Sequence, residues 1–278
     1  MKKKLTALLL AGVLCLGLVA CGSKAEDAKE PEDTAEPDTV QTDMEYVKEK
    51  GVLVVGITDF APMDYKDESG EWIGFDADMA KAFADSLGVD VEFVEIDWDN
   101  KILELNSGTI DCVWNGMTLT DEVTSSMECS NAYCNNAQVV IVPVDKAADY
   151  QTVEACADLT FAVEAGSAGQ DEVVALGVPD NQIIAVQDQA AALMEVAAGT
   201  SDAAVIDSLM AAAMVGEGTG YADLTYTVGL NSEEYGVGFR TGSDLAAALN
   251  DFFAAAYADG SMLEIAETYG VQAALIEQ

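Results

Sequence analysis

The stretch that decides the fold runs from residue 51 to residue 62 and reads GVLVVGITDFAP. Its first six residues form a nearly continuous apolar run bounded by Gly51 and Gly56, which predicts a buried β-strand. The remainder, from Ile57 to Pro62, is predicted to be a polar loop. A buried strand that opens into a polar loop is the first unit of the pattern that continues along the chain.

The next units keep the same alternation of strand and helix. Residues 65–71 predict a hairpin turn, and residues 76–87 predict a helix because their apolar side chains share one face. Strands are predicted over residues 91–96 and 110–114, with a helix between them that Asp99 or Asn100 caps. This β-α-β-α-β rhythm predicts a mainly parallel sheet with ligand-binding loops at the carboxyl ends of its strands.

The pattern restarts after the β-branched run at 139–142, which suits a buried strand that crosses between two lobes. The predicted elements of the second half are strands at 159–163, 183–186 and 203–206, a Gly-rich turn at 166–169, a second crossing near 235–239, and helices at 245–257 and 262–269. The predicted fold class is therefore α/β, with two lobes, as a chain of this length favours.

The amino terminus carries a separate signal. Three lysines at positions 2–4 precede an apolar run from Leu5 to Val19, which is shorter than a comfortable membrane span. The following Leu-Val-Ala-Cys resembles the lipobox of bacterial lipoproteins. That resemblance implies a signal peptide over residues 1–20, lipidation of Cys21, and an extracytoplasmic protein anchored to the outer face of the cell membrane. An ordinary cleaved signal with a coincidental cysteine is the alternative.

The segment 21–43 is rich in Ala, Glu, Asp, Pro and Thr and nearly lacks large apolar residues. Such a composition buries too little apolar surface to offset the entropy of ordering. We therefore expect this segment to be a disordered acidic tether.

The chain is strongly acidic, with 12 Lys and Arg, 50 Asp and Glu, and a formal net charge of −38. Loss of the three lysines at positions 2–4 would bring the net charge to about −41, and Arg240 is the only arginine. A nucleic-acid partner is excluded, because binding requires cations that neutralise phosphates. The charge is explained mainly as a property of the surface.

The cysteines do not predict a metal site. Cys112, Cys129, Cys134 and Cys156 stand singly without paired zinc-ligand spacing, and the chain has no histidine. Buried thiols are expected, and a Cys129–Cys134 disulfide stays open because spacing alone does not decide it. No metal and no cofactor are predicted.

A series of short motifs carries a family resemblance. In chain order they are Gly56, Ala61-Pro62-Met63, Gly74-Phe75-Asp76, Asp97-Trp98, Ser107-Gly108, Asp111, Gly116-Met117-Thr118-Leu119-Thr120, Gly166-Ser167, Asp202-Ala203-Ala204, Asp207 and Ala258-Asp259-Gly260. Their order and spacing, from about Val52 to Gly270, resemble the bacterial extracellular solute-binding proteins of family 3. This resemblance implies the type II periplasmic-binding-protein fold, with residues 45–140 plus 237–278 in lobe 1 and residues 144–232 in lobe 2.

The resemblance also implies ligand-binding positions in lobe 1. Phe60 and Trp98 match the aromatic or apolar residues that sandwich the ligand side chain, and packing within the lobe is the alternative. The segment from Asn115 through Gly116 and Met117 to Thr118 matches the one whose backbone and hydroxyl hold the ligand's polar ends.

Lobe 2 and one further loop complete the implied site. Asp207 matches the carboxylate that pairs with the α-ammonium of the ligand. Gly166 and Ser167 match a turn that offers N–H groups to the ligand carboxylate at the start of a helix. Asp59 is a second candidate carboxylate, for which an ordinary loop role is equally consistent with the sequence.

One position departs from the family pattern. Relatives usually carry an arginine where this chain has Val123, and that arginine forks onto the α-carboxylate of the ligand. Three interpretations stay open: an amino acid bound without the arginine, a ligand without a free carboxylate, or a degenerate receptor. Lys101 could reach the mouth of the cleft, but an exposed helix lysine is the expectation.

The resemblance implies a non-enzymatic monomer that captures a polar amino acid or related amine and hands it to the permease of an ABC importer. A neutral or cationic ligand is favoured, because the implied cleft offers carboxylates and aromatic rings with almost no cations. The alternatives are an extracytoplasmic solute sensor and a dehydratase-like enzyme on the same fold, since fold alone does not decide function.

Overall fold

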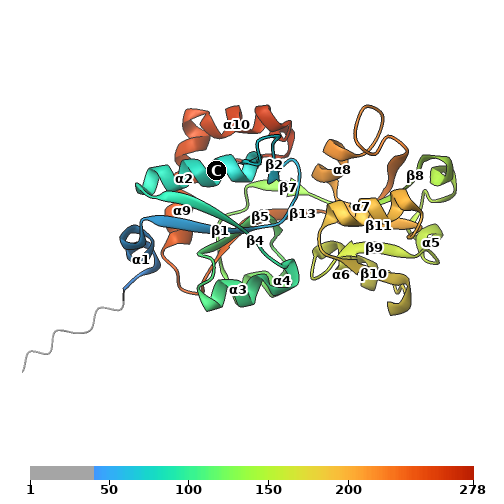
Figure 1. Ribbon diagram of the computed structural model, residues 1–278, viewed down its shortest axis with the longest axis horizontal. Coiled ribbons are helices and arrows are strands. Elements are labelled where there is room, and N and C mark those ends of the chain that lie inside the picture. Colours follow the sequence, from blue (N-terminus) through green and yellow to red (C-terminus); the bar gives the residue numbers. More distant parts are fainter. Residues whose placement is uncertain (1–40) are drawn as a thin grey trace, which may run out of the picture. The chain divides into compact units, whose positions relative to one another are not determined.

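The computed structural model describes residues 41–278, drawn in colour in Figure 1. The expected signal peptide, Cys21 and nearly all of the expected tether lie outside these residues. Within residues 41–278, no helix is long and apolar enough to cross a bilayer. The end of the expected tether is ordered, because Thr42 caps helix α1 (Asp43–Lys50) in a capping box with Glu45.

The first sheet carries the predicted parallel core. Its path runs β4-β1-β5-β13-β6, and β7 pairs separately with β13. The strands are β1 (Val52–Ile57), β4 (Asp90–Glu95), β5 (Cys112–Thr118), β6 (Glu128–Cys129), β7 (Cys134–Asn136) and β13 (Glu233–Phe239). β1 is parallel to β4 and β5, whereas β13 is antiparallel to β5. The carboxyl ends of β1, β4 and β5 therefore lie along one edge of the sheet.

The second sheet repeats this arrangement with the order β10-β9-β11-β8-β12. Its strands are β8 (Gln138–Pro143), β9 (Phe161–Glu164), β10 (Ile183–Val186), β11 (Ala203–Asp207) and β12 (Leu224–Gly229). β9 is parallel to β10 and β11, and β8 is antiparallel to β11. The start of β8 therefore lies at the same edge as the carboxyl ends of its parallel neighbours.

Helices cover both faces of each sheet (Figure 1). Around the first sheet these are α2 (Phe75–Leu87), α3 (Lys101–Ser107), α4 (Asp121–Ser126), α9 (Leu245–Asp259) and α10 (Ser261–Tyr269). Around the second sheet they are α5 (Val153–Cys156), α6 (Ala168–Ala175), α7 (Gln189–Ala198) and α8 (Ser208–Met214). A small hairpin of β2 (Tyr65–Lys66) and β3 (Trp72–Ile73) occupies the predicted turn. The two-lobed α/β prediction is confirmed.

Two of the differences between the predicted and the observed elements bear on the site. The strand expected to end at Trp114 continues to Thr118, because pairing with β13 resumes at Met117 after an irregularity at which Gly116 adopts a φ of 54°. The run at 139–142 belongs wholly to the second sheet, since β8 starts at Gln138. The two chain crossings are therefore Ala137, between β7 and β8, and residues 230–232, between β12 and β13.

The four cysteines of the described region are free thiols, so the optional Cys129–Cys134 disulfide does not form. Cys129 pairs with Gly238 and Cys134 with Tyr235, at different points along β13. Their strands therefore use separate parts of the same neighbour, and strand pairing rather than a cross-link holds them.

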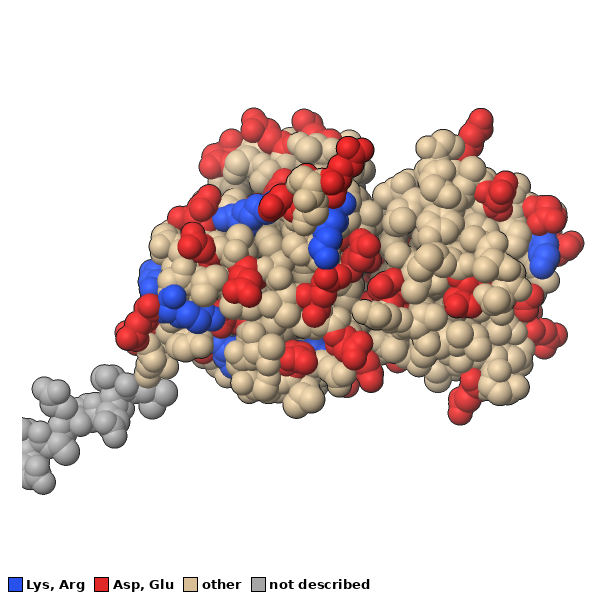
Figure 2. All heavy atoms as spheres, in the orientation of Figure 1, with Lys and Arg blue, Asp and Glu red and all other residues tan. Residues whose placement is uncertain are grey.

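Acidic side chains are spread over the visible surface of both sheet regions, with far fewer Lys and Arg between them (Figure 2). One cluster of paired charges is partly buried in the first region. Arg240 lies between Asp43 and the fully buried Asp111, with its guanidinium 3.1 Å and 3.6 Å from their carboxylates. Lys50 also reaches Asp111 at 2.6 Å. This cluster ties helix α1 and the end of β13 to the loop that enters β5.

We expect Arg240→Met to reduce the free energy of unfolding by at least about 2 kcal/mol, because it leaves Asp111 with one cation instead of two. The matched control is Lys66→Met, whose ion pair with Glu95 is exposed on both sides and is worth below about 1 kcal/mol. Urea denaturation measures both. Equal losses for the two variants would contradict the role assigned to the buried cluster.

Candidate functional site

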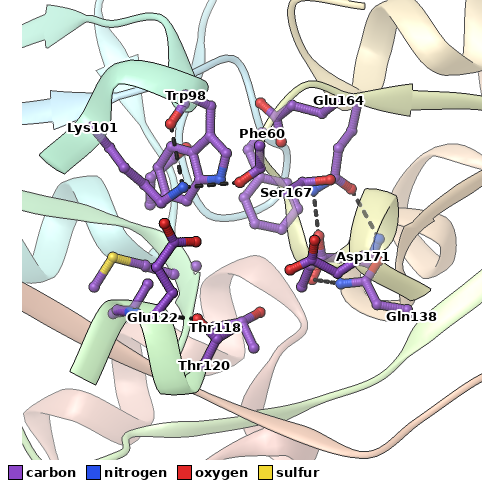
Figure 3. A pocket seen from close by; sticks show the side chains of 18 residues that line it. Phe60, Trp98, Lys101, Thr118, Thr120, Glu122, Gln138, Glu164, Ser167 and Asp171 are labelled. Atoms are coloured by element: carbon purple, nitrogen blue, oxygen red, sulfur yellow. Dashed lines mark hydrogen bonds between the residues drawn. The ribbon is translucent and has the colours of Figure 1, made fainter. Parts of the chain in front are cut away.

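A polar cavity lies where the carboxyl ends of the two parallel sheet cores face each other. Figure 3 shows side chains from both sheet regions pointing into it, with Trp98 and Lys101 opposite Glu164 and Gln138. Its lining consists of Phe60, Trp98, Lys101, Asn115, Gly116, Met117, Thr118, Thr120, Glu122, Val123, Gln138, Glu164, Gly166, Ser167, Ala168, Asp171, Gln189 and Asp207. Nine of the ten sequence-predicted ligand positions are thus brought together.

The aromatic side comes from the first sheet region. Phe60 follows β1, Trp98 follows β4, and both are nearly buried. The main chain of Phe60 is fixed by a hydrogen bond from its N–H to the carbonyl of Asp64, at 2.7 Å. Its ring packs on Gly116, where an added Cβ would lie 2.3 Å from the ring. Glycine is therefore required at position 116 for two reasons: its positive φ and the close approach of the Phe60 ring.

The side chain of Asn115, which also lines the cavity, is held by hydrogen bonds within the first sheet region. Its amide oxygen accepts from the N–H and hydroxyl of Thr58, and its nitrogen donates to Asp64 at 2.7 Å. The adjacent Gly116 N–H donates to the buried Asp76 at 2.6 Å. These bonds join the loop after β1 to β5, so Asn115 positions the wall of the cavity.

Asp207 ends β11 and is almost completely buried. Its carboxylate accepts from the side chains of Asn136, Gln138, Gln189 and Tyr235, the last at 2.6 Å. Burial, followed by the nearby Glu233, raises the pKa of Asp207 to about 7, although the bonds from Tyr235 and Gln189 act in the opposite direction. The site therefore holds Asp207 in a fixed orientation at the cavity wall.

The turn after β9 is shaped by Gly166 and Ser167. Gly166 has a φ of 69°, and an added Cβ would lie 2.7 Å from the Cα of Asp99, in the other sheet region. The hydroxyl of Ser167 caps α6 by accepting from the N–H of Gln170 at 3.1 Å. The first N–H groups of an eight-residue helix thus lie at the cavity edge.

Asp59 is the predicted position that the structure separates from the others. Its side chain is exposed and lines a different small hollow, with Glu95, Gln187 and Asp188. Asp59 and Phe60 are adjacent in the chain but line different hollows.

The expectation that Lys101 is exposed was wrong. Its residue is only 7% exposed, its Nζ donates to the carbonyl of Gly166 at 2.9 Å, and it lies over the ring of Trp98. Burial lowers the pKa of Lys101, while nearby carboxylates, Glu122 first, act against that shift. This single contact joins the start of α3 to the turn after β9. Val123 lines the same cavity as a buried apolar side chain.

Sequence reasoning also missed polar lining residues of the second region. Glu164 was overlooked because β9 runs one residue beyond its predicted end, and Gln138 because an antiparallel strand brings its start to the site edge. Gln189 begins α7, separated from the end of β10 by two residues. The missed signal was the rule that polar residues gather at the carboxyl ends of parallel strands, applied with one residue of tolerance.

Burial raises the pKa of Glu164 to about 8, with further contributions from Asp207 and Asp188. This group binds a proton more tightly in the folded chain than in the unfolded chain, so its contribution favours folding most at acidic pH. That contribution is lost as the pH rises from the ordinary glutamate value through about 8.

We therefore expect the melting temperature of the ligand-free chain to fall between pH 5 and pH 8, and to fall less in Glu164→Gln. At pH 8 the variant should be more stable than the unmodified chain, because a buried charge has been removed. Thermal unfolding followed by circular dichroism at several pH values measures this. Parallel pH profiles for the two proteins would contradict the burial argument.

Two α/β lobes joined by two short crossings, with a polar cavity enclosed between their facing strand ends, define a bilobal solute-binding protein. The family described as bacterial extracellular solute-binding proteins, family 3, matches residues 53–272, and the chain belongs to it.

Several known proteins are similar to the chain. A probable histidine-binding protein of Neisseria gonorrhoeae is 31% identical over 88% of this chain and 86% of its own length. The ABC transporter glutamine-binding protein of Bacillus subtilis is 28% identical over 95% and 96%. A histidine-bound substrate-binding protein of an ABC uptake transporter from Streptococcus pneumoniae superposes with a TM-score of 0.76 at 30% identity, covering 84% and 98%. A cyclohexadienyl dehydratase of Pseudomonas aeruginosa is 28% identical over about half of each chain.

Proposed function

We propose that the chain captures a polar amino acid or related amine in this cavity and delivers it to the permease of an ABC importer. The observation that carries the proposal is the enclosure of Asp207 and Trp98, from different lobes, in one polar cavity. The names of the similar proteins support it, since one is a probable histidine-binding protein, one a glutamine-binding protein of an ABC transporter, and one a histidine-bound substrate-binding protein of an ABC uptake transporter. The same proposal includes a monomer held outside the cell by lipid on Cys21.

Asp207 is the group proposed to receive the α-ammonium of the ligand. Its orientation is already fixed by side-chain donors, so little ordering remains to be done on binding. A charged hydrogen bond to a buried group such as Asp207 is stronger than one at the surface.

The α-carboxylate is proposed to lie near Lys101 and the turn at Gly166, Ser167 and Ala168. Lys101 is the one cation among the residues that line the cavity, and its ammonium forms no ion pair within 4.0 Å to a carboxylate of the described chain. The first N–H groups of α6 add donors at the same edge. Of the three interpretations of Val123, this arrangement favours an amino acid bound without the arginine.

An amino acid at a hundredfold excess over its dissociation constant should raise the stability of the chain by about 2.7 kcal/mol. A thermal-shift panel of amino acids, amines and short peptides on the chain from residue 22 onward measures this. Asp207→Asn should weaken binding of the best compound at least a hundredfold, because the carboxylate charge is lost. The exposed Asp251→Asn is the control and should bind normally. Equal affinity of both variants would contradict the role of Asp207.

Closure of the cavity gives a second test. Gly166→Ala should weaken binding at least tenfold, because its Cβ would press on Asp99 and force the two lobes apart. Gly177→Ala is the matched control, since Gly177 has a φ of 81° and open space around it. Both variants carry a backbone penalty of about 1 kcal/mol, so only the affinity should distinguish them. Equal affinities would show that this contact is not needed for closure.

Two other functions remain open to experiment. A dehydratase-like activity is suggested by the Pseudomonas aeruginosa relative, and conversion of a bound compound detected by mass spectrometry would favour it. A sensor would bind ligand without supporting uptake. Loss of uptake of the bound amino acid on deletion of the gene would instead favour transport.

A further inference from the structure

Glu164 is an acidic group of the cavity that the proposed binding of an α-amino and α-carboxyl group does not use. It is the last residue of β9, is 3% exposed and lines the cavity. Its Oε1 atom is buried without a hydrogen-bond partner among the described residues. A buried carboxylate oxygen without a donor is costly, so a ligand that supplies a donor would relieve that cost.

Other buried carboxylates of the chain differ from Glu164 in one respect each. Asp207 already has four side-chain donors. Asp111 is paired with Lys50. Asp64 and Asp76 each have an unpartnered oxygen, but neither lines the cavity. Glu164 therefore combines burial, an unpartnered oxygen and a position at the cavity.

The buried charges of the cavity form a simple set. Lys101, Glu164 and Asp207 are each below 9% exposed, whereas Glu122 and Asp171, which also line the cavity, are exposed and screened by water. The buried charged groups of the cavity are thus one cation and two carboxylates. A ligand with one carboxylate and two cationic groups carries charges complementary to them.

Lys101 does not neutralise Glu164 directly. Its ammonium is committed to the carbonyls of Gly166 and Trp98, at 2.9 Å and 3.3 Å, and forms no ion pair within 4.0 Å among the described residues. In Figure 3 the two side chains enter the cavity from opposite walls. The cavity that Glu164 lines is also lined by the aromatic residues Phe60 and Trp98, and a carboxylate together with aromatic rings suits a cationic side chain.

Resting on the proposed function, we propose that Glu164 receives the positively charged side chain of the ligand, and that the chain selects basic amino acids over neutral ones. In this arrangement Asp207 takes the α-ammonium and Lys101 the α-carboxylate. The ligand's net charge of +1 then balances the net −1 of the buried charged groups.

A consequence is a proton released on binding. The groups that raise or lower the proton affinity of Glu164 are Asp207, Asp188, Gln189 and Lys101, and burial is the largest influence. With the pKa of Glu164 raised to about 8, much of this group is protonated at pH 7 when the cavity is empty. A bound cation stabilises the ionised form, so the proton leaves.

Isothermal titration calorimetry of the unmodified chain and of Glu164→Gln tests the proposal with L-arginine, L-lysine, L-histidine and L-glutamine. The unmodified chain should bind its best basic amino acid at least tenfold more tightly than L-glutamine. Glu164→Gln should lose at least tenfold for that basic amino acid and should bind L-glutamine no more weakly than before. The control variant Glu154→Gln, at an exposed site on α5, should behave as the unmodified chain.

Repeating the titration at pH 7 in buffers of different ionisation enthalpy measures the proton. The unmodified chain should release protons on binding a basic amino acid, from Glu164 and in part from Asp207, whose pKa is also raised, and Glu164→Gln should release fewer. Thermal unfolding of the variant separates lost binding from lost folding.

The outcomes that overturn the proposal are distinct. Tighter binding of L-glutamine than of every basic amino acid by the unmodified chain would refute the selectivity and leave the amino-acid-binding function standing. Unchanged affinity for the basic amino acid in a folded Glu164→Gln would refute the role of Glu164. Binding of no amino acid at all by the folded, unmodified chain would refute both the proposed function and this inference.

Discussion

The structure depends on burying charge where two sheets present their strand ends to each other. Charged side chains leave water only at a large cost unless opposite charges and donors replace the solvent. Asp207 meets this requirement with side-chain donors, and Lys101 meets it with two backbone carbonyls. Glu164 does not meet it in full, since one of its oxygens lacks a donor. The cavity therefore contains a buried carboxylate oxygen without a donor, and a ligand can supply that donor.

The two chain crossings between the lobes lie next to residues that donate hydrogen bonds to Asp207. Glu233, at the start of β13, accepts from Thr118 at 2.9 Å, and also from Asn136 and Gln138. The last two side chains also donate to Asp207. The segments that join the lobes thus share donors with a carboxylate of the cavity. Any change in lobe orientation that moves β7, β8 or β13 will alter the surroundings of Asp207, which is a physical route from binding to closure.

Much of this arrangement could be predicted because it follows from strand direction. Phe60, Trp98 and Asp207 were placed at the ends of predicted parallel strands, and the structure brings them into one cavity. The family resemblance added Gly166 and Ser167, at a turn whose close contact with Asp99 depends on tertiary packing.

The features that could not be predicted depend on shifts of a single residue or on contacts between residues far apart in the chain. Glu164 lies one position past the predicted strand, and Asp59 lies one position outside the cavity. The burial of Lys101 depends on a carbonyl 65 residues away in the chain, which no local periodicity encodes. The irregularity in β5 at Gly116 likewise depends on pairing with β13.

The most direct test of the account is a crystal structure of the chain grown with L-arginine. We expect the guanidinium within hydrogen-bond distance of Glu164, the α-ammonium at Asp207 and the α-carboxylate at Lys101 and the turn after β9. Electron density that places the guanidinium away from Glu164, or an empty cavity at saturating L-arginine, would contradict it.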